Sequence, residues 1–187
     1  MRVKLLAIFI VLGFFLQGYE YKYDVPVLDA TNNAIKRNNQ GIMYMEMGNY
    51  AAAMTSFKTA IALNPNSPAS AAYYNNLGLL YTKLRQYKEA QDCFNAAISI
   101  NPVFLEYYKN QIDLYSKAGT LNSFLNNSLA QINQNRKNSQ AYLYAGLAYA
   151  QMKNKELAKK YLKRFVVLEK NQILSRAIKQ YIEELDG

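Results

Sequence analysis

The sequence predicts an all-α protein, an α-solenoid of helix-turn-helix repeats closed by a C-terminal capping helix. Its 187 residues include four prolines and eight glycines among many Ala, Leu, Lys, Gln and Tyr residues, and this composition favours helices. No stretch alternates apolar and polar residues as a half-buried strand does. A 37-residue repeat between residues 41 and 102 then indicates stacked helical pairs, because internal repeats of about 20 to 50 residues are typical of such arrays.

The N-terminus differs from the rest of the chain. Arg2 and Lys4 precede an unbroken run of 12 apolar residues, 5–16. A membrane-spanning helix needs roughly 20 apolar residues, whereas an export signal has a basic start and an apolar run of roughly 7 to 15. We therefore expect residues 1–18 to be a signal peptide. Because Leu16 makes a poor cleavage site before Gly18, the alternative is an N-terminal membrane anchor, and in both cases residues 19–33 are expected to be a tether.

Seven identities define the repeat. At a shift of 37 residues they pair Gly41, Tyr44, Tyr50, Ala53, Phe57, Ala60 and Pro65 with Gly78, Tyr81, Tyr87, Ala90, Phe94, Ala97 and Pro102. The Gly and Ala positions let two helices approach closely, and the aromatic rings fill the space beside each near contact. Pro65 and Pro102 lack a backbone donor and disfavour helical geometry in the preceding residue, so each is expected to end a second helix.

This pattern resembles the tetratricopeptide repeat, a 34-residue helix pair with Leu-Gly, Tyr, Ala, Phe, Ala and Pro at set places. On this resemblance the units are residues 34–67, 71–104, 105–138 and 139–172, with residues 68–70 inserted between the first two. The third unit is degenerate: Ile112 stands where Gly is usual, Phe124 and Ser128 where Ala and Phe are usual, and Arg136 where Pro is usual. The resemblance implies a right-handed solenoid whose first helices line a concave side.

Residues 173–187 are expected to form the capping helix, because a repeat array otherwise exposes an apolar face at its end. At helical spacing Leu174, Ile178, Tyr181 and Leu185 share one face. The opposite face is charged. The expected helix therefore has one face for the last unit and one face for water.

The residue types exclude several kinds of chemistry. The chain has no histidine and one cysteine, Cys93, so catalytic triads, histidine-built zinc sites and internal disulfides are ruled out. The acidic residues are scattered, and no pair of them shares a helical face beside an expected cleft. We therefore expect no enzyme activity, no cofactor and no metal. Cys93 is interpreted as a small buried hydrophobe.

The expected binding surface is the groove lined by the first helices. Its candidate residues are Asn38, Ile42, Met45, Asn75, Asn76, Leu79, Thr82, Lys109, Asp113, Leu143 and Leu147. The asparagines would hydrogen-bond the backbone of a partner peptide or helix, and the aliphatic residues would accept its apolar side chains. The alternative for Ile42, Leu79, Leu143 and Leu147 is that they complete the packing between units. Some family members hold a chaperone's C-terminal carboxylate with Lys, Asn and Arg; among the corresponding positions here Asn76 alone matches, which disfavours that ligand.

The net charge of +9 is unevenly distributed, with nine basic and two acidic residues between positions 131 and 170. The candidate polyanion contacts are Lys155, Lys159, Lys160, Lys163 and Arg164. The expectation is a solvated outer face. The alternative is contact with a polyanion, either an anionic membrane surface or nucleic acid, and the export signal disfavours nucleic acid.

These observations together predict a non-catalytic adaptor that binds a partner protein. By analogy with other exported members of the family, it is expected outside the cytoplasmic membrane, in the periplasm or on the extracellular side, where it would assist assembly of a cell-envelope complex. The sequence leaves the partner's identity and the oligomeric state open.

Overall fold

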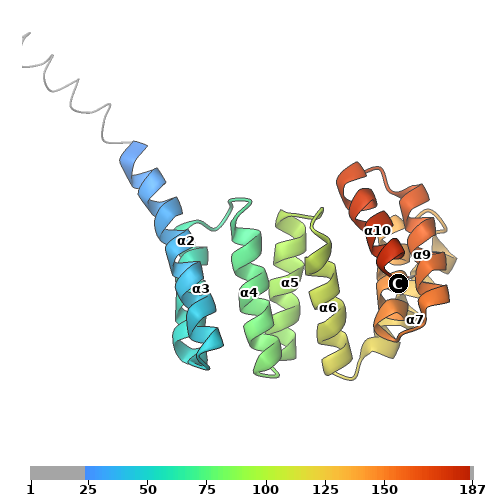
Figure 1. Cartoon of the computed structure of the whole chain (residues 1–187), viewed down its shortest axis with the longest axis horizontal. Helices are drawn as coiled ribbons and strands as arrows, with labels where there is room; N and C mark the ends of the chain where they lie inside the picture. Colours follow the sequence, from blue (N-terminus) through green and yellow to red (C-terminus); the bar gives the residue numbers. More distant parts are fainter. Residues whose placement is uncertain (1–23, 186–187) are drawn as a thin grey trace, which may run out of the picture.

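The computed structural model describes residues 24–185, and within this range the chain forms α-helices and no strand. The helices are α2 (Asp24–Glu46), α3 (Tyr50–Leu63), α4 (Ser70–Lys83), α5 (Tyr87–Ile100), α6 (Leu105–Lys117), α7 (Leu121–Gln134), α8 (Ser139–Gln151), α9 (Lys155–Leu168) and α10 (Gln172–Glu184). They stack side by side as antiparallel pairs along one axis (Figure 1). The predicted all-α solenoid is confirmed.

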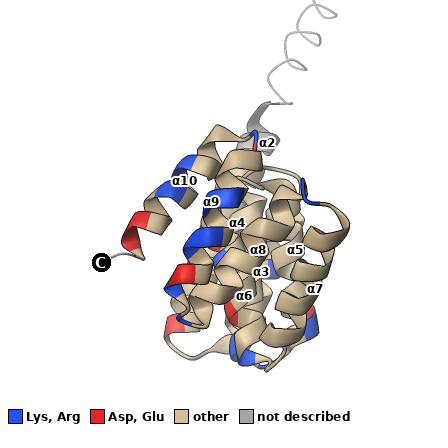
Figure 2. Ribbon diagram, turned by 90° about the vertical axis from the view of Figure 1, so that its right-hand side faces the viewer, with Lys and Arg blue, Asp and Glu red and all other residues tan. Residues whose placement is uncertain are grey.

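The loops that connect the helices lie along two opposite edges of the array. We call the end with the loops between units, where α2 also begins, the inter-unit end. The end with the tight turn inside each unit is the turn end. The first helices α2, α4, α6 and α8 form the first-helix side, and α10 lies on this side whereas α7 lies on the opposite one (Figure 2).

Helix α2 begins earlier than the sequence suggested. The tether was expected to reach residue 33, but α2 starts at Asp24 and runs for 23 residues. Pro26 stands in the first turn, where its missing N–H removes no intrahelical bond. Asn64 Nδ2 donates to Thr31 Oγ1 at 3.3 Å, which ties this extension to the end of α3. The expected signal peptide and the first part of the tether lie outside the described residues, and between residues 24 and 185 no helix has the length and hydropathy needed to span a membrane.

In three of the four helical pairs, a glycine on the first helix allows the second helix to pack closely against it. A Cβ built on Gly41 would lie 2.5 Å from Phe57 Cε1, and one on Gly78 would lie 2.8 Å from Phe94 Cε1. In the fourth unit a Cβ on Gly146 would lie 2.6 Å from Leu162 Cγ. Any side chain at these positions would force the facing side chain or the second helix to shift. This is why the repeat keeps a small residue on one helix and a large one sixteen positions later.

The third unit is built differently. Ile112 and Ser128 occupy the Gly and Phe positions, and α6 packs mainly on α5 and α8 and much less on α7. Aromatic rings bridge the wider space: Phe124 stacks on Tyr115 with centroids 4.1 Å apart and meets Tyr144 of α8 edge-on at 5.2 Å. The degenerate repeat therefore keeps its helices but not its internal close contact.

Helix α10 covers more than the end of the array. It packs on α9 and also reaches α6, where Lys109 Nζ lies 5.5 Å from the Tyr181 ring centroid. Leu174, Ile178 and Ile182 join the core that contains the inward side chains of α8. The capping helix thus crosses the first-helix side of the last two units, a position that its amphipathic pattern alone did not predict.

Candidate functional site

The expected groove is divided into a covered half and an open half. In the covered half, Leu143 and Leu147 are 1% and 2% exposed, and both belong to the core that also contains Leu174, Ile178 and Ile182 of α10. This corrects the expectation that they accept a partner's side chains; their role is packing. The open half is formed by α2, α4 and the turn end of α6.

Asparagine side chains connect the first helices to one another. Asn76 Nδ2 donates to Asn38 Oδ1 at 2.9 Å, and Asn110 Nδ2 donates to Asn75 Oδ1 at 2.9 Å. Asn38 and Asn75 are buried, and Asn76 is half-buried. The amides that were expected to bind a partner's backbone instead satisfy each other, which fixes α2, α4 and α6 side by side. A search for amide residues at the repeat spacing would have found this ladder.

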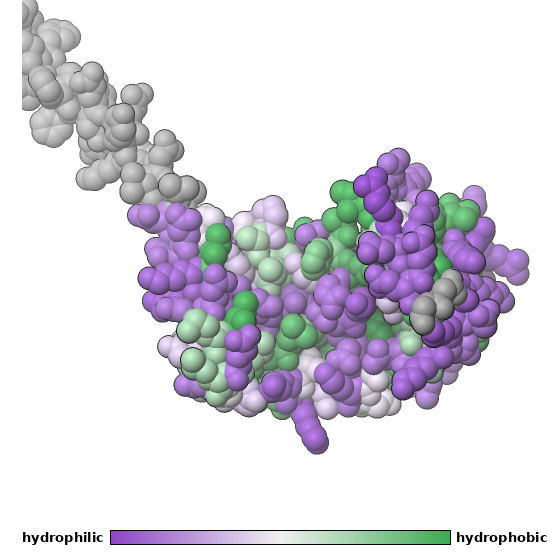
Figure 3. Space-filling model, viewed as in Figure 1, coloured by the Kyte–Doolittle hydropathy of each residue, from purple (hydrophilic) through white to green (hydrophobic). Residues whose placement is uncertain are grey.

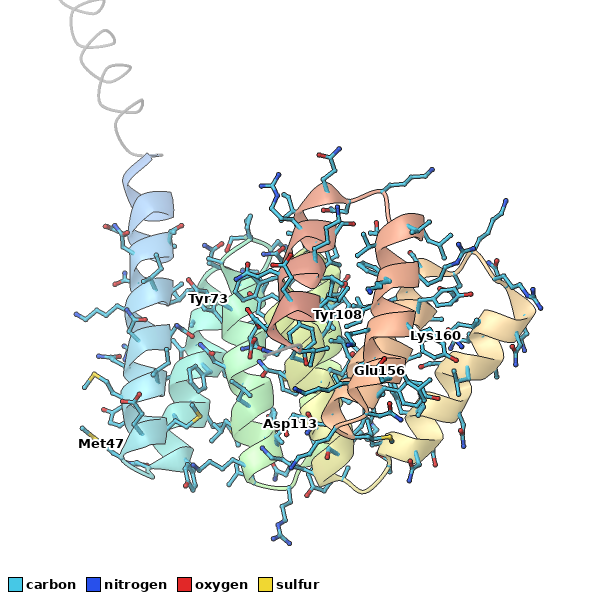
Figure 4. All side chains as sticks on the ribbon, turned by 45° about the vertical axis from the view of Figure 1, so that its right-hand side comes forward. Met47, Tyr73, Tyr108, Asp113, Glu156 and Lys160 are labelled. Atoms are coloured by element: carbon cyan, nitrogen blue, oxygen red, sulfur yellow. The ribbon has the colours of Figure 1, made fainter. Side chains whose placement is uncertain are left out.

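Three further candidate residues are also engaged inside the protein. Thr82 is buried, and its Oγ1 donates to the Gly78 carbonyl oxygen at 2.9 Å. Lys109 pairs with Glu106 at 3.0 Å, and Asp113 pairs with Lys117 at 2.7 Å (Figure 4). Ile42, Met45 and Leu79 remain half-buried and form the apolar part of the open half.

A hollow of about 660 Å³ opens at the turn end of this half. We call it the basic hollow, and its lining is Met45, Leu79, Thr82, Lys83, Arg85, Tyr87 and Lys117. Three lining residues carry positive charge and none carries a carboxylate. Sequence reasoning missed these cations because Lys83 and Lys117 are the last residues of their helices and Arg85 lies in a turn. Their equivalent places in successive units are the signal that could have found them.

The contacts inside the basic hollow keep its walls in place. Lys83 Nζ lies 5.6 Å from the Tyr50 ring centroid, and the Tyr87 hydroxyl donates to the Lys117 carbonyl oxygen at 3.1 Å. The Tyr50 ring holds the Lys83 ammonium by a cation–π contact. The hydrogen bond from Tyr87 joins α5 to the end of α6. Such a site offers an apolar floor beside cations, which suits a carboxylate that adjoins an apolar side chain.

Sequence comparison with known families matches residues 32–102 and residues 140–168 to the tetratricopeptide repeat. The two matches together cover more than half of the chain, and they fall on the helix pairs closed by glycine. The chain belongs to the tetratricopeptide repeat family. A comparison with curated proteins finds no significant match.

Several solved tetratricopeptide repeat structures are similar to this chain. PilF of Pseudomonas aeruginosa is 17% identical with a TM-score of 0.50, over 84% of this chain and 78% of that one. MamA is 23% identical with a TM-score of 0.47, over 84% and 85%. The second repeat domain of human RPAP3, solved with the HSP70 peptide SGPTIEEVD, is 16% identical with a TM-score of 0.46, over 84% and 98%. At this identity the likeness to PilF is a likeness of fold.

The carboxylate-binding pattern of some tetratricopeptide repeat proteins is not reproduced here. Two of the corresponding positions, Asn38 and Asn76, are hydrogen-bonded to each other, and Asn110 is bonded to Asn75. Ile42 and Glu106 stand where that pattern has polar or basic side chains. The cations of the basic hollow lie elsewhere, at the turn end.

The candidate polyanion residues of this repeat protein do not share one surface. Lys159 pairs with Glu156 at 3.0 Å and is half-buried, so the expected row with Lys155 and Lys163 is interrupted. Lys163 lines a hollow shared with Lys179 of α10. Lys160 and Arg164 line a different hollow of about 520 Å³, together with Arg136, Tyr142, Tyr161, Ile132 and Asn133 (Figure 4). The structure thus adds Arg136 to this second group.

Cys93 lies buried in the second unit against the core of α3, α4 and α5. Burial, with a smaller contribution from the nearby Asp92 carboxylate, raises the pKa of the Cys93 thiol to about 11. A thiol in this state is a poor nucleophile and a poor metal ligand at neutral pH. Its place in the tetratricopeptide repeat is therefore a packing position.

Proposed function

We propose that this tetratricopeptide repeat protein is a non-catalytic adaptor that binds a segment of a partner protein in the open half of its first-helix side. The observation that supports this proposal is the combination of an apolar floor from Ile42, Met45 and Leu79 with the basic hollow at the turn end. The other half is covered by α10, so the open half is the part of the groove that an outside segment reaches.

The chemistry of the site defines the partner segment. Met45 and Leu79 give an adaptable aliphatic surface that favours a medium-sized apolar side chain. Lys83, Arg85 and Lys117 favour a carboxylate beside it, and Asp113 offsets part of the charge of Lys117. The proposed ligand is therefore a peptide or helix with an acidic residue next to an apolar one.

We also propose that the protein acts outside the cytoplasmic membrane and assists the assembly of a cell-envelope complex. The basic start and the 12-residue apolar run at the N-terminus support export or anchoring. A protein-binding repeat outside the cytoplasmic membrane suits a scaffold that holds the parts of an envelope complex together. Intact-mass measurement of the protein purified from its own cells tests this: a chain that keeps residues 1–18 and stays in the cytoplasmic fraction contradicts export and anchoring alike.

Selection from a random peptide library tests the binding site. The full chain should enrich peptides that place an acidic residue beside an apolar one. Changing Leu79→Asp puts a charge on the apolar floor and should abolish binding of these peptides. Changing Lys83→Glu should weaken it by roughly tenfold, which corresponds to about 1.4 kcal/mol.

The matched controls lie away from the groove. Val167→Asp places the same charge on an exposed apolar position of α9, and Lys137→Glu reverses an exposed cation in the loop before α8. Both should leave the affinity unchanged in isothermal titration. Selected peptides that bind the Leu79 variant as well as the natural protein would show that the open half is not the binding site.

A further inference from the structure

The inter-unit end of the array carries exposed apolar side chains from four different elements. Phe104 precedes α6 and is 51% exposed, Val167 near the end of α9 is 71% exposed, and Ile173 at the start of α10 is 65% exposed. Leu63, the last residue of α3, is also exposed. Apolar surface lies along the upper edge of the molecule beside α10 (Figure 3). The exposed large apolar residues at the turn end, Met43, Tyr44 and Met47, all lie in the last turn of α2 or directly after it.

Cations accompany these apolar residues. Arg136 and Lys137 lie in the loop between α7 and α8, and Lys170 lies in the loop between α9 and α10; all three are exposed. Lys and Arg residues, blue in Figure 2, lie on α9, on α10 and in the loop beside α7. Arg136 also lines the 520 Å³ hollow, which extends from this end along α9 to Arg164 and Lys160. The end of the molecule therefore combines positive charge with scattered apolar contacts.

The carboxylates near this end are mostly occupied by protein partners. Glu169 accepts hydrogen bonds from Ser139 Oγ at 3.0 Å and from the Asn171 backbone N–H at 2.9 Å. Glu106 pairs with Lys109 at 3.0 Å. Asp29 of α2 is exposed. These neutral donors leave Glu169 charged, so it offsets part of the charge of Lys170, whereas Arg136 and Lys137 form no ion pair among the described residues.

The chain also enters the fold at this end, because Asp24 begins α2 there and residues 1–23 precede it. In the sequence, seven residues separate their 12-residue apolar run from the start of α2. We propose that the inter-unit end lies against an anionic membrane surface, with Phe104 and Ile173 in the headgroup region and the loop cations Arg136, Lys137 and Lys170 holding lipid phosphates. This inference is independent of the partner proposed above.

The free energies expected for such cations support contact with a membrane surface. Each Lys or Arg near an anionic leaflet contributes about 1 kcal/mol, and stable attachment commonly takes an apolar element and a basic patch together. In this protein, exposed apolar side chains and cations lie together at the inter-unit end. The basic hollow lies at the opposite, turn end, so a protein held in this way keeps its proposed binding site away from the lipid.

Tryptophan reporters test the orientation, because the natural sequence contains no Trp. Phe104→Trp and Ile173→Trp place a fluorophore at the inter-unit end, and Met47→Trp places one at the turn end, where Met47 is 72% exposed (Figure 4). Each full-length variant is mixed with phosphatidylcholine vesicles that contain or lack phosphatidylglycerol. The first two should shift to shorter wavelength and resist iodide quenching on the anionic vesicles, and Met47→Trp should do neither.

Charge reversal tests the role of the cations. In the Phe104→Trp background, Arg136→Glu, Lys137→Glu and Lys170→Glu together should raise the lipid concentration needed for half of the spectral shift by roughly 100-fold. The matched reversal of Lys83, Arg85 and Lys117 to Glu should leave it unchanged, with circular dichroism confirming the fold of both. The proposal is overturned by equal shifts at Phe104 and Met47, by no shift at Phe104 and Ile173, or by equal shifts on neutral and anionic vesicles.

Discussion

The second and third helical pairs have similar lengths but pack in different ways. In α4–α5 the backbone of Gly78 lies against the Phe94 ring, and the two helices form a close pair. In α6–α7 the positions hold Ile112 and Ser128, and α6 rests on its neighbours α5 and α8 instead. The difference shows that a repeat unit can lose its internal close contact when the adjacent units supply the packing.

Tyr144 of α8 is the residue that replaces the missing contact. Its ring meets Phe124 and also Tyr108, at 5.7 Å, and its hydroxyl donates to Gln111 Oε1 at 2.9 Å. Gln111 Nε2 in turn donates to Asn95 Oδ1 at 2.7 Å. Burial raises the pKa of the Tyr144 hydroxyl, so it stays protonated and keeps donating. Stability in the third unit therefore depends on the fourth.

The largest expected effect comes from removing the aromatic ring on which the packing of each unit depends. Phe94→Ala and Tyr144→Ala should each lower the free energy of unfolding by about 3–5 kcal/mol, the cost of deleting a buried aromatic side chain. Ser128→Ala, at the position equivalent to Phe94, should cost less than about 1 kcal/mol. Urea denaturation followed by circular dichroism measures all three. An equal loss for Ser128→Ala and Phe94→Ala would contradict the proposed difference between the units.

A smaller effect is expected at the glycine contact. Gly78→Ala gains helix propensity but puts a Cβ 2.8 Å from the Phe94 ring, so the ring or the helix must shift. We expect a net loss of about 1–3 kcal/mol, which is typical of overpacking. A stabilised Gly78 variant in thermal unfolding would show that the close contact is dispensable.

The smallest effect concerns the turns of the same two units. Arg85 in the turn of α4–α5 has φ 59°, and Gly119 at the equivalent place of α6–α7 has φ 72°. A side chain in this left-handed region costs about 1–2 kcal/mol, partly offset by the greater freedom of glycine in the unfolded chain. Arg85→Gly should therefore stabilise the protein by about 0.5–1 kcal/mol, and Gly119→Ala should destabilise it by about 1 kcal/mol. Thermal midpoints that move in the opposite directions would reject the assignment.

The helix pairs could be predicted from the sequence because their signals are local and repeated. Gly41, Gly78, Phe57 and Phe94 recur at one spacing, and each contact joins residues of one unit. The degenerate third unit was also readable, since Ile112 and Ser128 break the size pattern there. Family membership followed from the same residues.

The candidate site was less predictable because it depends on contacts between distant segments. Asn38 and Asn75 are polar at groove positions, but which amide faces which is decided by the spacing of α2, α4 and α6. Leu143 and Leu147 look available in the sequence, but in the structure they belong to a core that includes residues of α10, and amphipathicity does not state which neighbours a helix packs against. Lys83 and Lys117 were overlooked because the apolar periodicity of a helix does not mark its last residue, although the two lie one repeat apart.

The return of α10 across the last two units also limits the length of a ligand. Neighbouring packed helices lie about 8–10 Å apart, so the open half, from α2 across α4 to the turn end of α6, spans roughly 20 Å between the outer helix axes. An extended chain advances about 3.3 Å per residue, and six or seven residues therefore fill this distance. A longer partner would have to turn away from the surface before it met α10, so the protein would read a short linear motif and leave the flanking sequence in solvent.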